Sequence, residues 1–395
     1  MTIPRTLGPL SNLHQMLVQV VESLPDGDLR RCPHRALYPP GWYLGRAVYL
    51  ETYWLRERLA GDDDLTRRVR HIFAKGACTP AAAAALLPPR DHLLNWALEI
   101  QDEHLTRLAN PALLPRGDVD PDWLASWLLQ AESSIYEDLL LAVTALRLGT
   151  PAAGFAVESP LRPAAPRADT VAVSQGHYRI GAREGVAFDN ELPAQVVELH
   201  SFRIAARPVG NAEYLAFMDD GGYLRDALWT ADGRAWRDAN GPARPFAWRA
   251  DAAGHWYAVG LNGPYELQPD EPVSGVSHFE AQAFAAWAAA QGGATAGAVL
   301  PHEYQWETAV RTRAITEHGR VPEWCGNRFE PYDQYQRPDD VELATLELDG
   351  RHFSLRGAAL HTQPCLRRPS LRRWGLPGDA HRLAGFRLVF PPRND

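Results

Sequence analysis

The chain of 395 residues has few cysteines, a single lysine and no long apolar run, and each shortage narrows its possible roles. Its four cysteines are far apart and form no CxxC pair, which argues against a zinc knuckle or a disulfide framework and favours a reducing, cytoplasmic location. No stretch reaches the roughly 18 apolar residues of a membrane span, and the N-terminus has no signal-peptide pattern. We therefore expect no membrane association.

The charge balance argues against nucleic acid as a partner. The formal net charge is −8, from 40 basic and 48 acidic residues, whereas a nucleic-acid footprint needs clustered basic groups. The expected partner is a small-molecule substrate, and the oligomeric state stays open. With 46% hydrophobic residues the chain can form a large core, and its length exceeds what one core usually supports, so two domains are predicted.

The pattern of apolar residues divides the chain into three parts. Residues 1–150 contain four stretches with helical spacing and predict a four-helix bundle, residues 151–172 are rich in Pro and Ala and predict a linker, and residues 173–395 predict a loop-rich α+β domain. The predicted long helices cover 8–25, 39–60, 90–108 and 121–148, the predicted β runs cover 178–181, 195–204, 352–356 and 385–390, and two short helices are predicted near 277–291 and 302–313.

The last helix of the bundle has an unusual polar stripe in its stretch LLQAESSIYEDLLL (128–141). Gln130, Ser134 and Glu137 fall at i, i+4 and i+7, on one face of a helix whose other residues suit burial. Glu137 is a candidate general base, because an apolar bundle raises the pKa of a carboxylate. The alternative is a hydrogen-bonding anchor between helices.

Several stretches together resemble a known family. The segments are SFRIAARPVGNAEYLAFMDDGGY (201–223), PVSGVSHFEAQAFAAWA (272–288), LPHEYQWETA (300–309), PEWCGN (322–327), LRGAALHTQP (355–364) and AGFRLVF (384–390). In this order they are similar to the formylglycine-generating-enzyme-like, or sulfatase-modifying-factor, domain. PPGWYLGRAVYLETYWLRERLAGDDDL (39–65) resembles the DinB-like bundle that precedes this domain in the sulfoxide synthases of ergothioneine biosynthesis, and LLPPRDHLLNWALEIQDEHL (86–105) looks most like selenoneine synthases.

The resemblance implies an iron enzyme, but its metal ligands are replaced here. Family members use non-haem iron and O2 to join a sulfur or selenium donor to the imidazole of hercynine, the trimethylated betaine of histidine, and three His side chains hold the iron. At the matching positions this chain has Tyr43 or Arg46, then Ala131 and Ile135. No metal is expected at the family site, and no cofactor is predicted.

A relocated metal site is an alternative. Four His lie in family segments of the second domain and would have to converge in space: His278, His302, His352 and His361. His104 is isolated in the sequence, and no HExxH motif exists. The copper site of formylglycine-generating enzymes is not expected either, because Thr362 and Arg367 occupy the positions of its two cysteines, while Cys365 lies elsewhere.

The substrate positions implied by the resemblance have gained positive charge. Arg373 replaces an Asn beside the betaine, next to Trp374, and Arg46 lies at a vacated metal position. One hypothesis is that Arg46 and Arg373 face a common cavity and bind an anion. The alternative is that the Arg46 side chain extends to the surface, or pairs with Glu137 or Glu51, and fills the space left by the metal.

Other family positions have structural alternatives as well. Trp324 and Asn327 are candidate substrate contacts, although such residues usually shape the loop network. Ser134 is a further candidate contact and Tyr43 a candidate catalytic residue, whereas Arg356 and Arg387 are predicted to form ion pairs in the domain core.

Three functions remain open from the sequence. The first is a diverged synthase that handles an amino-acid-derived small molecule and a sulfur or selenium donor without the iron triad. The second is a catalytically silent paralogue that binds a ligand or a partner. The third is an enzyme repurposed for an anionic substrate.

Overall fold

The protein divides into two compact units. The structure, a computed structural model, describes residues 6–110, 119–150, 154–183, 185 and 187–392. The first unit contains Met1–Thr150 together with Asp339–Ala344 and Gln363–Leu366, and the second contains the rest of the chain. The predicted boundaries at residues 150 and 172 remain a prediction.

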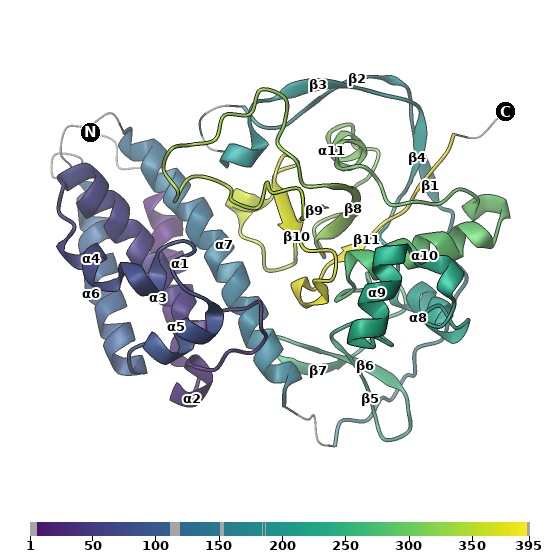
Figure 1. Cartoon of the computed structure of the whole chain (residues 1–395), viewed down its shortest axis with the longest axis horizontal. Coiled ribbons are helices and arrows are strands. Elements are labelled where there is room, and N and C mark those ends of the chain that lie inside the picture. The colour runs from purple at the N-terminus through teal and green to yellow at the C-terminus, as the bar shows by residue number, and fades with distance from the viewer. Residues whose placement is uncertain (1–5, 111–118, 151–153, 184, 186, 393–395) are drawn as a thin grey trace. The chain divides into compact units, whose positions relative to one another are not determined.

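Four long helices form the first unit, which confirms the predicted bundle (Figure 1). They are α1 (Leu7–Glu22), α3 (Pro40–Thr52), α6 (Arg90–Ala109) and α7 (Pro121–Leu148). Helices α1 and α3 each pack against α6 and α7. Shorter helices complete the unit: α2 (Asp26–Leu29), α4 (Asp64–Phe73) and α5 (Pro80–Leu86), and a π-helical turn over Tyr53–Arg58 continues α3.

The helix boundaries follow local chemistry. Pro39 is extended, and Pro40 opens α3, where its missing N–H costs no hydrogen bond. The Asp120 side chain accepts a hydrogen bond from the N–H of Asp122 and caps α7. In the middle of α3, Gly45 allows the Phe73 ring to approach the helix closely, because a Cβ at this position would lie 2.3 Å from the ring.

A short segment from far along the chain belongs to the first unit. The Tyr53 hydroxyl donates to Asp340 over 2.7 Å, and the Lys75 ammonium donates to the carbonyl of Ala344 over 2.5 Å. These contacts hold residues 339–344 against the π-helical turn that follows α3 and against the loop after α4. This return of the chain was not predicted.

The second unit is an α+β domain of small sheets and helices, as predicted. Its strands are β1 (Thr170–Val173), β2 (Gly176–Ile180), β3 (Gln195–Leu199), β4 (Phe202–Ala205), β5 (Trp248–Ala250), β6 (Trp256–Gly260), β7 (Gly263–Glu266), β8 (Glu323–Arg328), β9 (Phe353–Arg356), β10 (Arg372–Gly375), β11 (Gly385–Phe386) and β12 (Val389–Phe390). Its helices are α8 (Asn211–Asp219), α9 (Ala231–Asn240), α10 (His278–Ala290) and α11 (Glu303–Arg311).

The strands pair mostly in antiparallel fashion in four sheets. The orders are β1-β4-β12, β10-β9-β8-β11, β2-β3 and β5-β6-β7. Among the residues that the structure describes, the one parallel pair is β11 with β8. The β runs predicted at 195–204 and 385–390 are each two strands, so these two predictions were wrong in extent. Helices α8 and α9 were not predicted.

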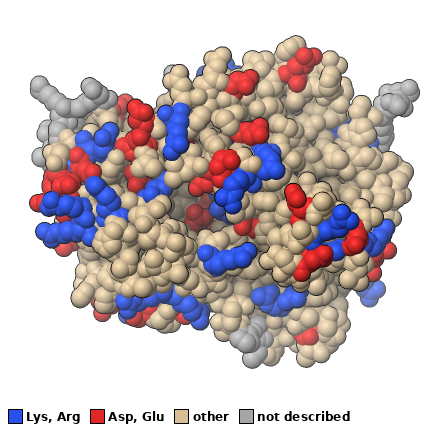
Figure 2. Space-filling model, viewed as in Figure 1, with Lys and Arg blue, Asp and Glu red and all other residues tan. Residues whose placement is uncertain are grey.

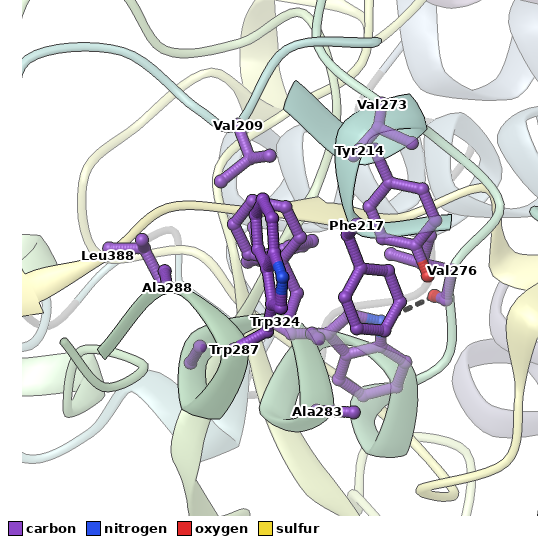
Figure 3. Packing of buried hydrophobic residues seen from close by; sticks show 14 of the residues in the cluster. Val209, Tyr214, Phe217, Val273, Val276, Ala283, Trp287, Ala288, Trp324 and Leu388 are labelled. Carbon is purple, nitrogen blue, oxygen red and sulfur yellow. Dashed lines mark hydrogen bonds between the residues drawn. The ribbon is translucent and has the colours of Figure 1, made fainter. Parts of the chain in front are cut away.

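The core of the second unit is aromatic (Figure 3). Tyr214 and Phe284 stack with their ring centroids 5.7 Å apart. Trp324 is fully buried, and its indole N–H donates to the carbonyl of Val276 over 2.9 Å, so its one polar group is satisfied.

Residues 154–169 contain no helix or strand but are fixed on the second unit. The Phe155 ring lies 4.8 Å from the Tyr257 ring, and the Ala164 N–H donates to the carbonyl of Ala212. Residues 154–169 therefore have the Pro- and Ala-rich composition of a linker but make defined contacts with the second unit.

Charged side chains are mixed in sign over the visible surface. Figure 2 shows basic and acidic residues interspersed on the face drawn. Among the helices of the described residues, none is both long enough and apolar enough to cross a membrane.

Candidate functional site

Four buried side chains, one from each long helix of the first unit, converge inside the bundle. They are His14 of α1, Glu51 of α3, His104 of α6 and Glu132 of α7, and none is more than 5% exposed. We call these residues the bundle cluster. His14 lies in the apolar stripe of α1 with Leu10, Leu13, Leu17 and Val21, which directs its imidazole into the core.

The contacts within the bundle cluster are short but poorly aligned for hydrogen bonding. Nε2 of His14 lies 2.6 Å from Oε1 of Glu51 and 3.2 Å from Oε2 of Glu132, yet none of these three atoms has a partner with hydrogen-bond geometry. Only Nδ1 of His104 and Oε2 of Glu51, 2.9 Å apart, are well placed for a hydrogen bond.

The electrostatics of the cluster are strongly coupled. Burial raises the pKa of Glu132, and the Glu51 carboxylate raises it further. Burial alone lowers the pKa of His14, but the two carboxylates outweigh this effect and raise it. Burial likewise opposes ionisation of Glu51, but His14 and His104 lower its pKa. Two buried carboxylates thus share one imidazole, and together they favour the positively charged form of His14.

Arg46 has a carboxylate partner that was not predicted. Its guanidinium donates to Glu342 and to the carbonyl of Phe73, the latter over 2.9 Å, and it is 8% exposed. The backbone N–H of Lys75 also donates to Glu342 over 3.2 Å. The alternative that Arg46 forms an ion pair is therefore correct, but Glu51 and Glu137 were the wrong partners.

The polar stripe of α7 lies on the opposite side of the helix from Glu132. At 100° per residue, Glu132 is rotated by 200° from Gln130. Gln130 and Glu137 are buried, and the Ser134 hydroxyl donates to the carbonyl of Gln130 in its own helix over 3.3 Å. The stripe was the visible signal in the sequence, whereas the converging carboxylate of α7 is Glu132.

Tyr43 is buried and contributes to an aromatic contact. Its hydroxyl accepts a hydrogen bond from the N–H of Tyr38 over 3.2 Å, and its ring packs edge-on against Trp42. Its predicted catalytic role remains a prediction.

The candidate substrate contacts of β8 have structural partners. Trp324 is part of the core. Asn327 accepts from the N–H of Glu303 over 2.8 Å and donates to its carboxylate over 3.0 Å. Asn327 also lines a hollow of about 490 Å³ with Leu300 and His302. Of these two residues, only Asn327 remains beside open space.

The remaining substrate candidates lie on β10. Trp374 stacks on Phe329 with ring centroids 5.1 Å apart, and Arg373 is partly buried. Because Arg46 belongs to the first unit and Arg373 to the second, their shared cavity remains a prediction.

The predicted ion-pair role of Arg356 and Arg387 is confirmed. Arg387 donates to both carboxylate oxygens of Glu323, over 2.5 and 2.9 Å. Arg356 donates to Glu303 over 3.2 Å and to Glu307. Arg372, which was not singled out, donates to both oxygens of Glu303 over 2.8 Å.

The relocated metal site proposed for the second domain was wrong. His278 contacts the carbonyl of Cys325, His302 caps α11, and His352 contacts Asp349. In the part of the chain that the structure describes, only His14, Glu51 and Glu132 bring three such ligand atoms within 4.8 Å of one another. His104 has no neighbouring ligand residue in the sequence, but in the structure its Nδ1 lies 2.9 Å from Oε2 of Glu51.

Comparison with known proteins agrees with this architecture. The sulfatase-modifying factor enzyme 1-like domain matches residues 157–318. The chain is 36% identical to a hercynine oxygenase of Mycolicibacterium smegmatis over 429 aligned residues, which cover 92% of this chain and 94% of that protein. It is 32% identical to a hercynine oxygenase of Mycolicibacterium thermoresistibile over 307 residues, which cover 76% of this chain and 64% of that protein.

A more distant relative matches a smaller part of the chain. The chain is 32% identical to the formylglycine-generating enzyme of Thermomonospora curvata over 179 residues, which cover 42% of this chain and 55% of that protein. The near-complete match to the M. smegmatis protein is decisive for the family. The chain belongs to the hercynine oxygenase family, and its C-terminal part is a sulfatase-modifying-factor-like domain.

The side chains at the positions that the sequence resemblance implies for the family iron do not fit an iron ion. Ala131 and Ile135 carry no donor atom. Arg46 stays positively charged and is already bound to Glu342 and to the carbonyl of Phe73. Tyr43, the other candidate at the first position, uses its hydroxyl to accept from Tyr38.

Proposed function

We propose that this protein is a diverged enzyme of the sulfoxide synthase and selenoneine synthase type. It joins a histidine betaine or a similar amino-acid-derived molecule to a sulfur or selenium donor through a C–S or C–Se bond. It does so without an iron ion at positions 46, 131 and 135. The imidazole C–H bond and the S–H or Se–H bond of the donor are broken, and O2 is the oxidant that accepts the two electrons and two protons released.

The observation that carries the proposal is the match over nearly the whole chain to a protein named hercynine oxygenase. A relationship that includes both the helical bundle and the C-terminal domain supports a retained class of substrate more strongly than a shared domain alone. The presence of Arg46 in an ion pair with Glu342 supports the second part of the proposal.

The ion pair of Arg46 also weighs against an anion-directed enzyme. A guanidinium that already has a buried carboxylate partner would have to lose it before binding a substrate anion in the same way. A silent, ligand-binding paralogue is instead distinguished by the assay below.

The test combines binding and turnover. Hercynine and, as a matched control, histidine are titrated into the purified full chain by calorimetry. We expect hercynine to bind at least about tenfold more tightly, equivalent to about 1.4 kcal/mol. The same protein is then incubated with hercynine, O2 and a thiol or a selenol donor, and the products are identified by mass spectrometry.

The outcomes separate the readings. Hercynine binding with formation of a C–S or C–Se product supports the proposal. Binding of hercynine without any product supports the silent paralogue. If hercynine does not bind, both the diverged synthase and a silent paralogue that binds hercynine are contradicted.

A further inference from the structure

The bundle cluster is set apart by its combination of burial and unsatisfied polar atoms. Five polar atoms of the cluster lack partners with hydrogen-bond geometry, although their residues are at most 5% exposed. These atoms are both carboxylate oxygens of Glu132, Oε1 of Glu51 and both ring nitrogens of His14. Buried polar groups are normally hydrogen-bonded, because an unpaired group keeps its full desolvation penalty. A bound ligand that accepts lone pairs from the carboxylate oxygens and the imidazole nitrogen would offset this desolvation penalty.

The atoms that lack partners are suited to a metal ion. An imidazole nitrogen and two carboxylates are common ligands of divalent ions such as Zn2+, Mn2+ and Fe2+. Bonds of about 2.0–2.1 Å in a tetrahedral site place ligand atoms about 3.3 Å apart. The His14 to Glu132 distance of 3.2 Å matches this spacing, and the 2.6 Å distance between His14 and Glu51 would lengthen on binding.

The charges are matched as well. Two buried carboxylates and neutral imidazoles carry a net charge of −2, which a divalent cation neutralises. Without such an ion, a proton must be retained on the carboxylates or His14 must be charged to limit the cost of burial.

His104 has the geometry of a supporting residue. Its Nδ1 lies 2.9 Å from Oε2 of Glu51, which leaves Oε1 of the same carboxylate turned towards His14. Metal ligands are commonly oriented by such an outer hydrogen bond. His104 is therefore a positioning residue for Glu51.

We propose that His14, Glu51 and Glu132 bind one divalent metal ion of the Zn2+, Mn2+ or Fe2+ class inside the helical bundle, with His104 orienting Glu51. The three ligands leave at least one coordination position for water or a small ligand. This site uses none of the positions implied for the family iron, and it stands independently of the proposed function.

The test is metal binding by the full chain. Protein stripped with a chelator is dialysed separately against Zn2+ and Mn2+, and the bound metal is measured by elemental analysis. Cobalt is used as an optical probe, because its visible absorption reports the coordination geometry. We expect one ion per chain in the wild type.

The variants locate the ion. Glu132→Gln removes one ligand charge with almost no change in shape, and it is expected to abolish stoichiometric binding. Glu137→Gln is the matched control, since Glu137 is a buried carboxylate of the same helix on a different face, and it is expected to bind one ion. His104→Ala should weaken binding about 10- to 100-fold, as expected for an outer-shell partner.

Every outcome decides the proposal. Wild-type protein that retains no ion would show that the cluster is held by protons, and equal binding by wild type and Glu132→Gln would place the ion elsewhere. Either result overturns the proposal. If Glu132→Gln does not fold, as judged by circular dichroism, His14→Gln supplies the same comparison.

Discussion

At the scale of single residues, Arg46 forms a buried ion pair in the bundle. Its guanidinium and the Glu342 carboxylate are both buried and contact each other directly. Such a pair adds little net stability, but removal of one partner leaves an uncompensated charge in a place that water cannot reach.

Arg46→Ala is therefore expected to destabilise the protein by about 3–5 kcal/mol. Denaturant unfolding followed by circular dichroism measures the loss. The double variant Arg46→Ala/Glu342→Gln is the control and should recover part of the stability, because it removes the stranded charge. A loss below about 1 kcal/mol in the single variant would show that the Arg46 ion pair contributes no more to stability than an exposed ion pair does.

His278 is a second residue whose environment leads to a measurable effect. It is fully buried against the Phe353 ring, and burial lowers its pKa from 6.5 to about 3. Below pH 6.5 the unfolded chain binds a proton that the folded protein does not bind. Stability therefore falls as the pH drops from about 6.5 towards 3.

We expect this group to cost about 2 kcal/mol of stability between pH 7 and pH 5. His278→Gln, which keeps a donor for the carbonyl of Cys325, should lose correspondingly less over the same range. Unfolding free energies of both proteins at the two pH values measure the difference. Parallel pH profiles would contradict the low pKa of His278.

At the scale of elements, β9, β10 and α11 are joined by buried ion pairs. Glu303 of α11 accepts hydrogen bonds from Arg372 of β10 and Arg356 of β9, over 2.8 to 3.2 Å. Burial opposes ionisation of Glu303, but Arg372 and Arg356 outweigh it and lower its pKa to about 2. The stability that this carboxylate contributes is present above about pH 4.5 and is lost as the pH falls towards 2.

Glu303→Gln is expected to cost about 3–5 kcal/mol at neutral pH, because two buried guanidinium groups lose their shared carboxylate. The exposed Glu317→Gln is the control and should stay within about 0.5 kcal/mol of the wild type. Urea unfolding at pH 7 measures both variants. Equal stability of the two variants would show that the ion pairs do not hold these elements together.

The same scale shows what the sequence could predict. Apolar spacing located α1, α3, α6 and α7. Helix α1 buries one stripe of residues, whereas α3 is buried on all sides and was recognised by its run of apolar residues after Pro39-Pro40. Small sheets assembled from distant strands, such as β8 with β11, carry no comparable local signal.

The candidate site was harder to predict than the fold. Glu342 is 296 residues from Arg46, so no local pattern links the two. The bundle cluster contains one residue from each of four helices, so no short sequence motif identifies it. The sequence could have indicated it only through titratable side chains at positions where the helical pattern predicts burial. His14 between Leu10 and Leu17 is such a residue, whereas the stripe of Gln130, Ser134 and Glu137 drew attention to a different face of α7.

At the scale of the whole molecule, the chain matches a hercynine oxygenase over nearly its full length. The positions that the sequence resemblance implies for the family iron hold Arg46, Ala131 and Ile135, while a separate group of carboxylates and imidazoles occupies the interior of the bundle. The central claim is that iron is not held at the family positions.

The most direct measurement is the iron content of Glu132→Gln after anaerobic loading with Fe(II), because this variant lacks a ligand of the bundle cluster. Any iron that it retains has to be held elsewhere. We predict far less than one iron per chain. One iron per chain in this variant, with turnover of hercynine in the presence of O2 and a donor, would contradict the account.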